Sequence, residues 1–435
     1  MKTNIENSTA AERLPARSRA RLLRIVVPFL ACACLVALVA ALWPHRAQNS
    51  NNNPPQLADH GSPTAPPSTV PRQDGTRRDA TSRPASPARP VYEQPEPTPG
   101  MRQLVNSLVE GGRGPLTEEQ ALAWKTNLQS LIQQGAQAVP AISEFLTKNT
   151  DFTFDPNERN QLGYPSLRSA MLDALAQIGG PVAVNAMAQV LQTAADPREI
   201  AFLGQNLEKL DPGVHRQEVF DAAREALGMA ADGKLPDRDV APLFEVLQQF
   251  GGAGAIGDLE SSAKQWNYYA MIALAGLPDQ AGIPSLARIA ATPEGVNPAA
   301  RMAALDMLAV AVPQSEDARA ALLDLVHQNQ LSASQWAALT PMLAGNQMVF
   351  HNSAFENVLA TVSPSDVKSM NIPASNQVIA TAPLGAMTTD QIDLRKAFLD
   401  QLLAVTSDPT AVQALQRAKD LLAQRLFQIA ATAGK

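Results

Sequence analysis

The sequence predicts an all-α protein, an α-solenoid in which short helices pair into hairpins and the hairpins stack side by side. Apolar residues recur every three to four positions through most of the chain after about residue 117. Aromatic residues make up only 5% of the 435 residues, while alanine is frequent in the second half. No segment shows the alternating, β-branched pattern that a strand needs. Small side chains and few rings favour closely packed helix pairs over a sandwich of strands.

The clearest hairpin is 167–191, in which two apolar stripes flank a glycine-rich corner. The stripes fall on one helical face each and comprise Leu167, Met171, Leu175, Ile178, Val184, Met187 and Leu191. Gly179 and Gly180 can end the first helix, and Pro181 is tolerated in the first turn of the second. One hairpin cannot bury its stripe alone, so the chain is expected to repeat it.

Similar layouts recur along the chain with an irregular period. They cover residues 124–146, 202–226, 242–259, 266–289 and 299–326. With their alanine-rich first helices, Gly or Pro corners and a small residue early in the second helix, these units resemble HEAT-type repeats over about 117–330. The resemblance implies a curved stack of helix pairs, and it implies no particular ligand.

The ends of this stretch carry their own signals. Thr117 and Gln120 have capping-box spacing, as do Thr388 and Gln391. Between them, Leu331 to Met387 is interrupted by residues that include Pro341, Gly345, Pro364, Pro373 and Pro383. These interruptions predict an irregular insertion of one or two short helices and a long loop within the repeat domain of 101–435. A last helix, about 410–431, suits a terminal cap.

The first 43 residues predict a membrane anchor. Residues 1–24 are polar and basic. Residues 25–43 form an uncharged, apolar segment that is long enough for a transmembrane helix. Because arginines precede this segment, the positive-inside rule puts the N-terminus in the cytoplasm of a bacterial-type cell and the rest of the chain in the periplasm. A retained signal anchor is preferred; cleavage near Ala41 and lipidation at Cys32 are the alternatives.

Residues 44–100 predict a disordered linker, because they include 13 prolines and few large apolar side chains. Either the linker holds the folded head away from the membrane, or its length serves no purpose. Residues 1–100 carry 12 Lys and Arg against 7 Asp and Glu, a net of +5, so the remaining residues carry a net of −11. An acidic head is a poor partner for nucleic acid, which needs positive charge to displace counterions. Both cysteines lie within 25–43, so the head has no thiol for catalysis or metal binding.

Two motifs suggest chemistry but lack the context it requires. Gly252 to Gly257 matches the dinucleotide fingerprint GxGxxG, yet a helical pattern precedes it where the fingerprint needs a strand, so a repeat corner is the better interpretation. Asp151 to Asn157 alternates oxygen side chains as a calcium loop does, but Pro156 and Leu162 occupy the positions of its glycine and glutamate. The five histidines are scattered. We expect no catalytic, metal or cofactor site from these patterns.

The densest aromatic cluster runs from Trp266 to Tyr269. Consecutive helical residues cover more than one face, so at least one ring is expected to approach the surface, and such rings are common anchors at interfaces. We therefore name Trp266, Tyr268 and Tyr269 as candidate partner-binding residues; the alternative is that they fill space between repeats.

Together these patterns predict a non-enzymatic, membrane-tethered scaffold whose helical domain docks a protein partner of the cell envelope. Two alternatives stay open: an envelope enzyme that uses the insertion at 331–387, and a structural protein that binds cell-wall polymer.

Overall fold

The computed structural model describes residues 95–433 except 149–150, 237, 293, 356–357 and 385–386, and it describes side chains up to Phe427. Most of these residues are helical. The basic tail, the predicted membrane span and nearly all of the predicted linker lie outside them. Among the described residues, no helix has both the length and the apolar character that a bilayer crossing requires.

The N-terminal part of the described chain contains five α-helices and a short 3₁₀ helix, Gly135–Gln137. The α-helices are α2 (Pro99–Gly111), α3 (Glu118–Gln133), α4 (Val139–Thr147), α5 (Pro156–Leu162) and α6 (Leu167–Ile178). The Thr117–Gln120 capping box is confirmed: the Thr117 N–H donates to Gln120 Oε1 at 2.9 Å, and Gln120 N–H donates to Thr117 Oγ1 at 3.2 Å. Helix α2 begins at Pro99, two residues inside the predicted linker.

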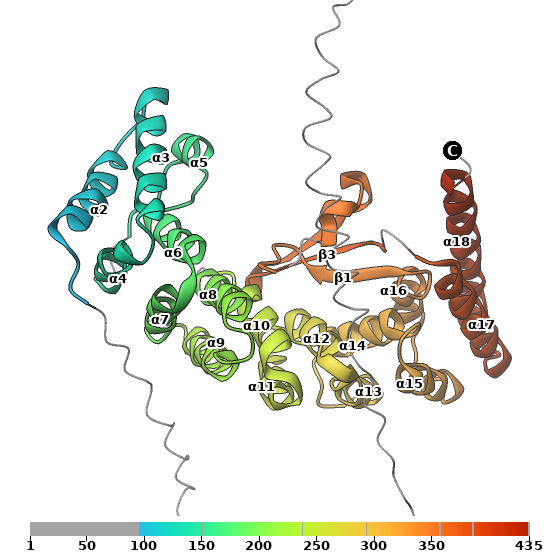
Figure 1. Ribbon diagram of the computed structural model, residues 1–435. Coiled ribbons are helices and arrows are strands. Elements are labelled where there is room, and N and C mark those ends of the chain that lie inside the picture. The colour runs from blue at the N-terminus through green and yellow to red at the C-terminus, as the bar shows by residue number, and fades with distance from the viewer. Residues whose placement is uncertain are drawn as a thin grey trace, which may run out of the picture. The chain divides into compact units, whose positions relative to one another are not determined.

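The middle of the chain forms two rows of helices. The first row holds α8 (Pro197–Leu210), α10 (Ala241–Gly251), α12 (Asn267–Ala275), α14 (Pro298–Ala311) and α16 (Ala333–Leu343). The second holds α7 (Gly180–Leu191), α9 (Arg216–Ala231), α11 (Ile256–Ser262), α13 (Ile283–Ala291) and α15 (Glu316–His327). Each first-row helix packs on the next one in its row, and most helices that follow one another in the chain pack across the rows (Figure 1). Each of the six stretches that the sequence predicts as hairpins contains two helices, and in four of them, 167–191, 202–226, 266–289 and 299–326, the two helices pack on each other.

Corners and small residues explain this packing. Gly179 and Gly180 have φ of 63° and 74°, values that residues with a side chain adopt with strain. Gly179 ends α6 and Gly180 begins α7. In α14, Ala300, Ala303 and Ala304 are buried, and their small side chains allow close approach of α12 and α13, its main neighbours. The buried apolar residues form one contiguous core from Val105 in α2 to Leu422 in α18.

The segment 331–387 differs from the sequence prediction. After α16 the chain forms a three-stranded antiparallel sheet in place of a long loop, in the order β1 (Asn346–Phe350), β3 (Gln377–Pro383), β2 (Lys368–Ile372). Asn346 pairs with Pro383 and Lys368 pairs with Thr381. The strands β1 and β3 pack on the first row at α12, and β1 also packs on α14 and α16 (Figure 1).

The chain closes with α17 (Thr389–Val405) and α18 (Pro409–Ala433), which pack on each other. The Thr388–Gln391 capping box begins α17 as predicted. The buried guanidinium of Arg395 in α17 donates to the carbonyls of Ala309 and Met342, both at 3.1 Å, near the ends of α14 and α16. Burial lowers the pKa of Arg395 to about 10.

Candidate functional site

The sheet and the first-row helices meet through a buried polar network. Gln377 of β3 has no exposed surface. Its Oε1 accepts the N–H of Tyr269 at 3.0 Å, and its Nε2 donates to Asn267 Oδ1 at 3.0 Å. Helix α12 has no side-chain cap of its own. Gln377 therefore satisfies an amide at the start of α12, so the sheet completes this helix.

Tyr269 ties the same strand to the loop before α10. Its hydroxyl accepts the N–H of Val378 at 2.7 Å and donates to Asp239 Oδ1 at 3.1 Å. Burial raises the pKa of Tyr269 far above its ordinary value. The neutral phenol is thus the form that holds β3 in place.

Glu245 of α10 anchors the chain that follows β1. It is 7% exposed, and its Oε2 accepts the N–H of Ala354 at 2.7 Å. Burial is the main effect on its pKa and raises it, while hydrogen bonds from Ser353 and Ala354 oppose the rise. A carboxyl in this setting serves first as a hydrogen-bond acceptor for the loop.

A cavity of about 710 Å³ lies between β1, the residues after it and the first row. Its helical wall comes from α8, α10, α12 and α14, largely from their apolar side chains and from glutamines of α8 and α10. Residues 347–350 of β1 also line the cavity. Among the described lining residues, Glu245 is the one ionisable group. Cavities of this size and mixed lining are typical of ligand and peptide sites.

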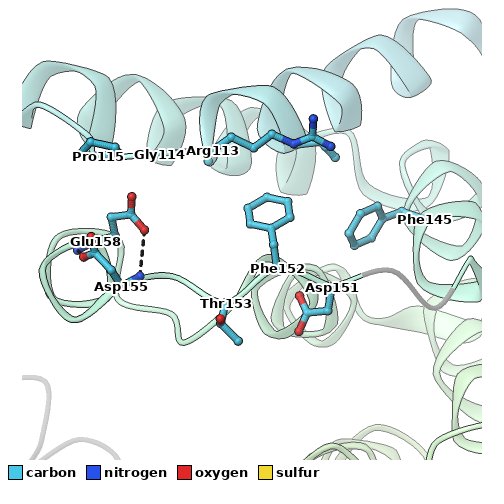
Figure 2. A pocket seen from close by; sticks show the side chains of 11 residues that line it. Arg113, Gly114, Pro115, Phe145, Asp151, Phe152, Thr153, Asp155 and Glu158 are labelled. Carbon is cyan, nitrogen blue, oxygen red and sulfur yellow. Dashed lines mark hydrogen bonds between the residues drawn. The ribbon is translucent and has the colours of Figure 1, made fainter.

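A second, open depression lies at the other end of the described chain (Figure 2). It measures about 540 Å³ and is bordered by Arg113 after α2 and by the segment 151–158. The acidic groups there already serve the backbone: Glu158 accepts the N–H of Asp155 at 2.9 Å, and Asp155 accepts the N–H of Asn157 at 2.8 Å. Asp155 and Glu158 thus cap the start of α5. This role fits the interpretation of residues 151–157 as an ordinary loop between helices.

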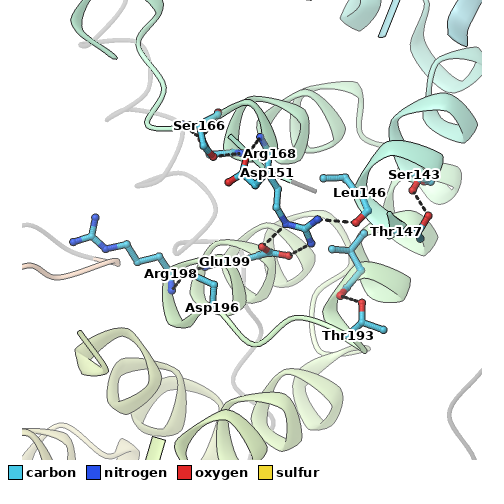
Figure 3. Close-up of polar contacts among 12 residues, drawn as sticks. Ser143, Leu146, Thr147, Asp151, Ser166, Arg168, Thr193, Asp196, Arg198 and Glu199 are labelled. Carbon is cyan, nitrogen blue, oxygen red and sulfur yellow. Dashed lines mark hydrogen bonds and ion pairs between the residues drawn. The ribbon is translucent and has the colours of Figure 1, made fainter. Parts of the chain in front are cut away.

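The most buried ion pair lies nearby and joins three helices (Figure 3). Arg168 of α6 makes a bidentate contact with Glu199 of α8, at 2.7 Å from Nε and 2.6 Å from Nη2. Its Nη1 donates to the carbonyl of Leu146 in α4 at 2.6 Å. Both side chains are only 10% exposed. The pair fixes the packing of α4, α6 and α8 and presents no free group to a ligand.

The three predicted partner-binding aromatics lie largely inside the protein. Trp266 is 4% exposed and Tyr269 is fully buried, with Phe244 and Phe350 against its ring at 5.7 and 5.4 Å between centroids. Tyr268 is half-buried. The structure thus packs Tyr269 against the sheet and Trp266 against Phe244 of α10, as expected if these rings fill space inside the protein. Partner binding by these rings stays a prediction.

The two other motifs have plain structural positions. Helix α10 precedes Gly252–Ala255, a 3₁₀ turn that leads into α11, so the strand required by the dinucleotide fingerprint is replaced by a helix. Within the described residues, no group of three or more His, Cys, Asp or Glu is placed to hold a metal ion.

Glu245, Gln377 and the cavity beside them are not predicted from the sequence. One signal was present: Glu245 stands alone among apolar neighbours in APLFEVLQQF, a setting in which a carboxyl is buried and needs a partner. The partner comes from residues more than 100 positions later, which a local pattern does not reveal.

No family model matches the chain, and no curated protein matches it.

Proposed function

We propose that the protein is a membrane-tethered scaffold whose HEAT-like α-solenoid docks a protein partner in the cell envelope. In this proposal residues 25–43 anchor the chain in the inner membrane with the N-terminus in the cytoplasm, and residues 44–100 link the anchor to a periplasmic head. The acidic balance of the head, −11 over residues 101–435, favours a partner that is not acidic.

The order of helix packing carries the proposal. Helices contact mainly their neighbours in the chain and the next helix of their row, so the stack offers long faces shared by many helices. Such faces suit recognition of another macromolecule better than convergence of catalytic groups. The cavity beside β1 adds a concave place on the first-row side.

Photo-crosslinking in intact cells tests the proposal. A benzophenone amino acid replaces Gln249, an exposed residue of the first-row helix α10, in the full-length protein; Ser261, exposed on the second-row helix α11, is the matched control. We expect one envelope protein to crosslink to position 249 in much higher yield than to position 261. Recovery of no protein adduct from either position would contradict a docking role.

The enzymatic alternative draws on one group, Glu245, because its pKa is raised beside a cavity. Its carboxyl is bound by Ser353 and Ala354, which favours a structural role over proton transfer. Activity screening of the wild type and of Glu245→Gln separates the catalytic role from the structural one. Loss of a catalytic carboxyl lowers turnover without lowering the yield of the crosslinked partner.

A further inference from the structure

We propose that the free edge of β1 is a strand-docking site for an extended peptide segment of the partner. The inference rests on the docking function proposed above and names the chemistry of the segment: a β-strand with apolar side chains at every second position and no net negative charge. It is supported by the strand order, the direction of the β1 backbone groups, the cavity beside them, a buried side-chain donor on β1 and the charge of the cavity lining.

The strand order leaves β1 with one unpaired edge. In the sheet β3 is central, and β1 and β2 flank it. The N–H of His351 donates to the Val378 carbonyl at 3.2 Å, and the N–H of Leu384 donates to the Gly345 carbonyl at 3.1 Å. Antiparallel pairs alternate between bonded and non-bonded positions. Odd-numbered residues of β1 therefore bond to β3, whereas the N–H and C=O groups of Met348 and Phe350 point away from it.

These outward groups belong to the part of β1 that lines the cavity. Residues 347–350 all contribute to its wall, and no hydrogen bond to the backbone N–H or C=O of Met348 or Phe350 from another described element is present. An unpaired edge is a template for a further strand. The first-row residues Ile272, Met307 and Val310 also line this cavity, and they offer apolar surface to every second side chain of that strand.

A shielded side-chain donor points to the same occupant. Gln347 Nε2 is excluded from solvent and has no hydrogen-bond partner among the described residues. A backbone carbonyl of an incoming peptide would accept a hydrogen bond from this amide, whereas a purely apolar ligand has no acceptor to offer it. The charge of the site also limits which peptides can bind. The described lining includes one carboxyl and neither Lys nor Arg, in a head of net charge −11, so an acidic peptide is disfavoured.

The probe is a fluorescein-labelled peptide of alternating lysine and valine, eight residues long, titrated into the full-length protein in detergent and followed by anisotropy. Three peptides serve as controls: one with glutamate for lysine, one with serine for valine, and one N-methylated at alternate residues. We expect the lysine–valine peptide to bind and each control to bind roughly tenfold or more weakly, since main-chain bonds, apolar contacts and charge each contribute. Equal binding of the N-methylated peptide would overturn the proposal.

Paired protein variants locate the site. Met348→Pro removes an N–H that β3 does not use, and roughly tenfold weaker binding is expected. Ser369→Pro makes the same change on the outer edge of β2, because Ser369 pairs with Ala380, whose backbone groups face β1, and binding is expected to be unchanged. Circular dichroism checks that both variants fold. Ala275→Trp, which fills the cavity from α12 and leaves β1 intact, supplies a second test: unchanged binding there overturns the proposal.

The two proposals fail separately. If position 249 crosslinks a protein in cells but the lysine–valine peptide does not bind as expected, the docking role stands and the strand-docking site is wrong. If the peptide binds at β1 but no partner is recovered in cells, the site stands and the envelope docking role is wrong.

Discussion

Asp306 is a buried acid without a compensating partner. It lies on α14, is 5% exposed, and its Oδ1 has no hydrogen-bond partner among the described residues. Burial raises its pKa well above the ordinary value. Burial also raises the pKa of Tyr268, and the nearby Asp306 raises it further. An ionised Asp306 therefore opposes folding.

Asp306→Asn is expected to stabilise the protein at neutral pH. Because the folded pKa is above the unfolded one, the stability linked to this acid is full below about pH 4 and is lost as the pH rises through the folded pKa. The neutral amide of the same shape avoids this loss, so a gain of ~1–3 kcal/mol at pH 7.5 is expected, shrinking towards about pH 4.5. Urea unfolding of both proteins at the two pH values measures it. If the variant and the wild type differ in free energy of unfolding by the same amount at pH 4.5 and at pH 7.5, Asp306 is not desolvated.

Arg168 and Glu199 depend on each other. Arg168→Met leaves the Glu199 carboxylate buried and unpaired, and a loss of ~3–5 kcal/mol in the free energy of unfolding is expected. The double variant Arg168→Met with Glu199→Leu removes both charges and is expected to recover most of that loss, apart from the bond to the Leu146 carbonyl. A double variant as unstable as the single one, in the same unfolding experiment, would mean that the pair acts through packing alone.

At the scale of elements, Gly282 sits at a tight corner between α12 and α13. A Cβ there would lie 2.0 Å from the carbonyl oxygen of Leu274, whereas a Cβ on Gly257 of α11 would meet nothing within 4 Å. Gly282→Ala is expected to destabilise by ~1–3 kcal/mol through this clash, and Gly257→Ala to stabilise by ~0.5–1 kcal/mol through helix propensity. Thermal unfolding compares them. Equal melting temperatures would mean that the corner relaxes freely.

The hairpins were predictable because each carries its signal locally. Stripes with helical spacing on both sides of a Gly or Pro corner define the pair whatever lies beside it, as at Gly179 and Gly180. Capping boxes at Thr117 and Thr388 are local in the same way.

The sheet and the site were not predictable in this way. Strand β1 is five residues long, and the buried side chains of β3 include the small Ala380 and Ala382, so no strong alternation marks either strand. The burial of Trp266 and Tyr269 has a related cause. Trp266 precedes α12 with φ −120°, so the residues from Trp266 to Tyr269 are not all helical. Strand β3, from about 100 positions later, packs on Asn267 and Tyr269.

For the whole molecule, the sheet joins helices that are distant in the chain. Gln377 lies 110 positions from Asn267, and Glu245 lies 109 from Ala354. In a stack with contacts mainly between neighbours, such links couple units that would otherwise unfold separately. The sheet therefore supports the first row as well as bordering the cavity.

Gln377→Ala tests this coupling. The change leaves the Tyr269 N–H and Asn267 without their partner in a buried place, so a loss of ~1–3 kcal/mol and a broader urea transition are expected. Asn371→Ala, on the exposed strand β2, is the control and is expected to change little. A sharp, unshifted transition for Gln377→Ala would show that the sheet contributes no coupling.

The most direct test of the account is amide hydrogen exchange along β1, resolved to single residues in the full-length protein. In the free protein, Gln347, Val349 and His351 are expected to exchange slowly and Met348 and Phe350 quickly, because only the former bond to β3. Addition of the lysine–valine peptide is expected to slow Met348 and Phe350 as well. Slow exchange of all five amides in the free protein, or fast exchange of Met348 and Phe350 with the peptide bound, would contradict a docking edge at β1.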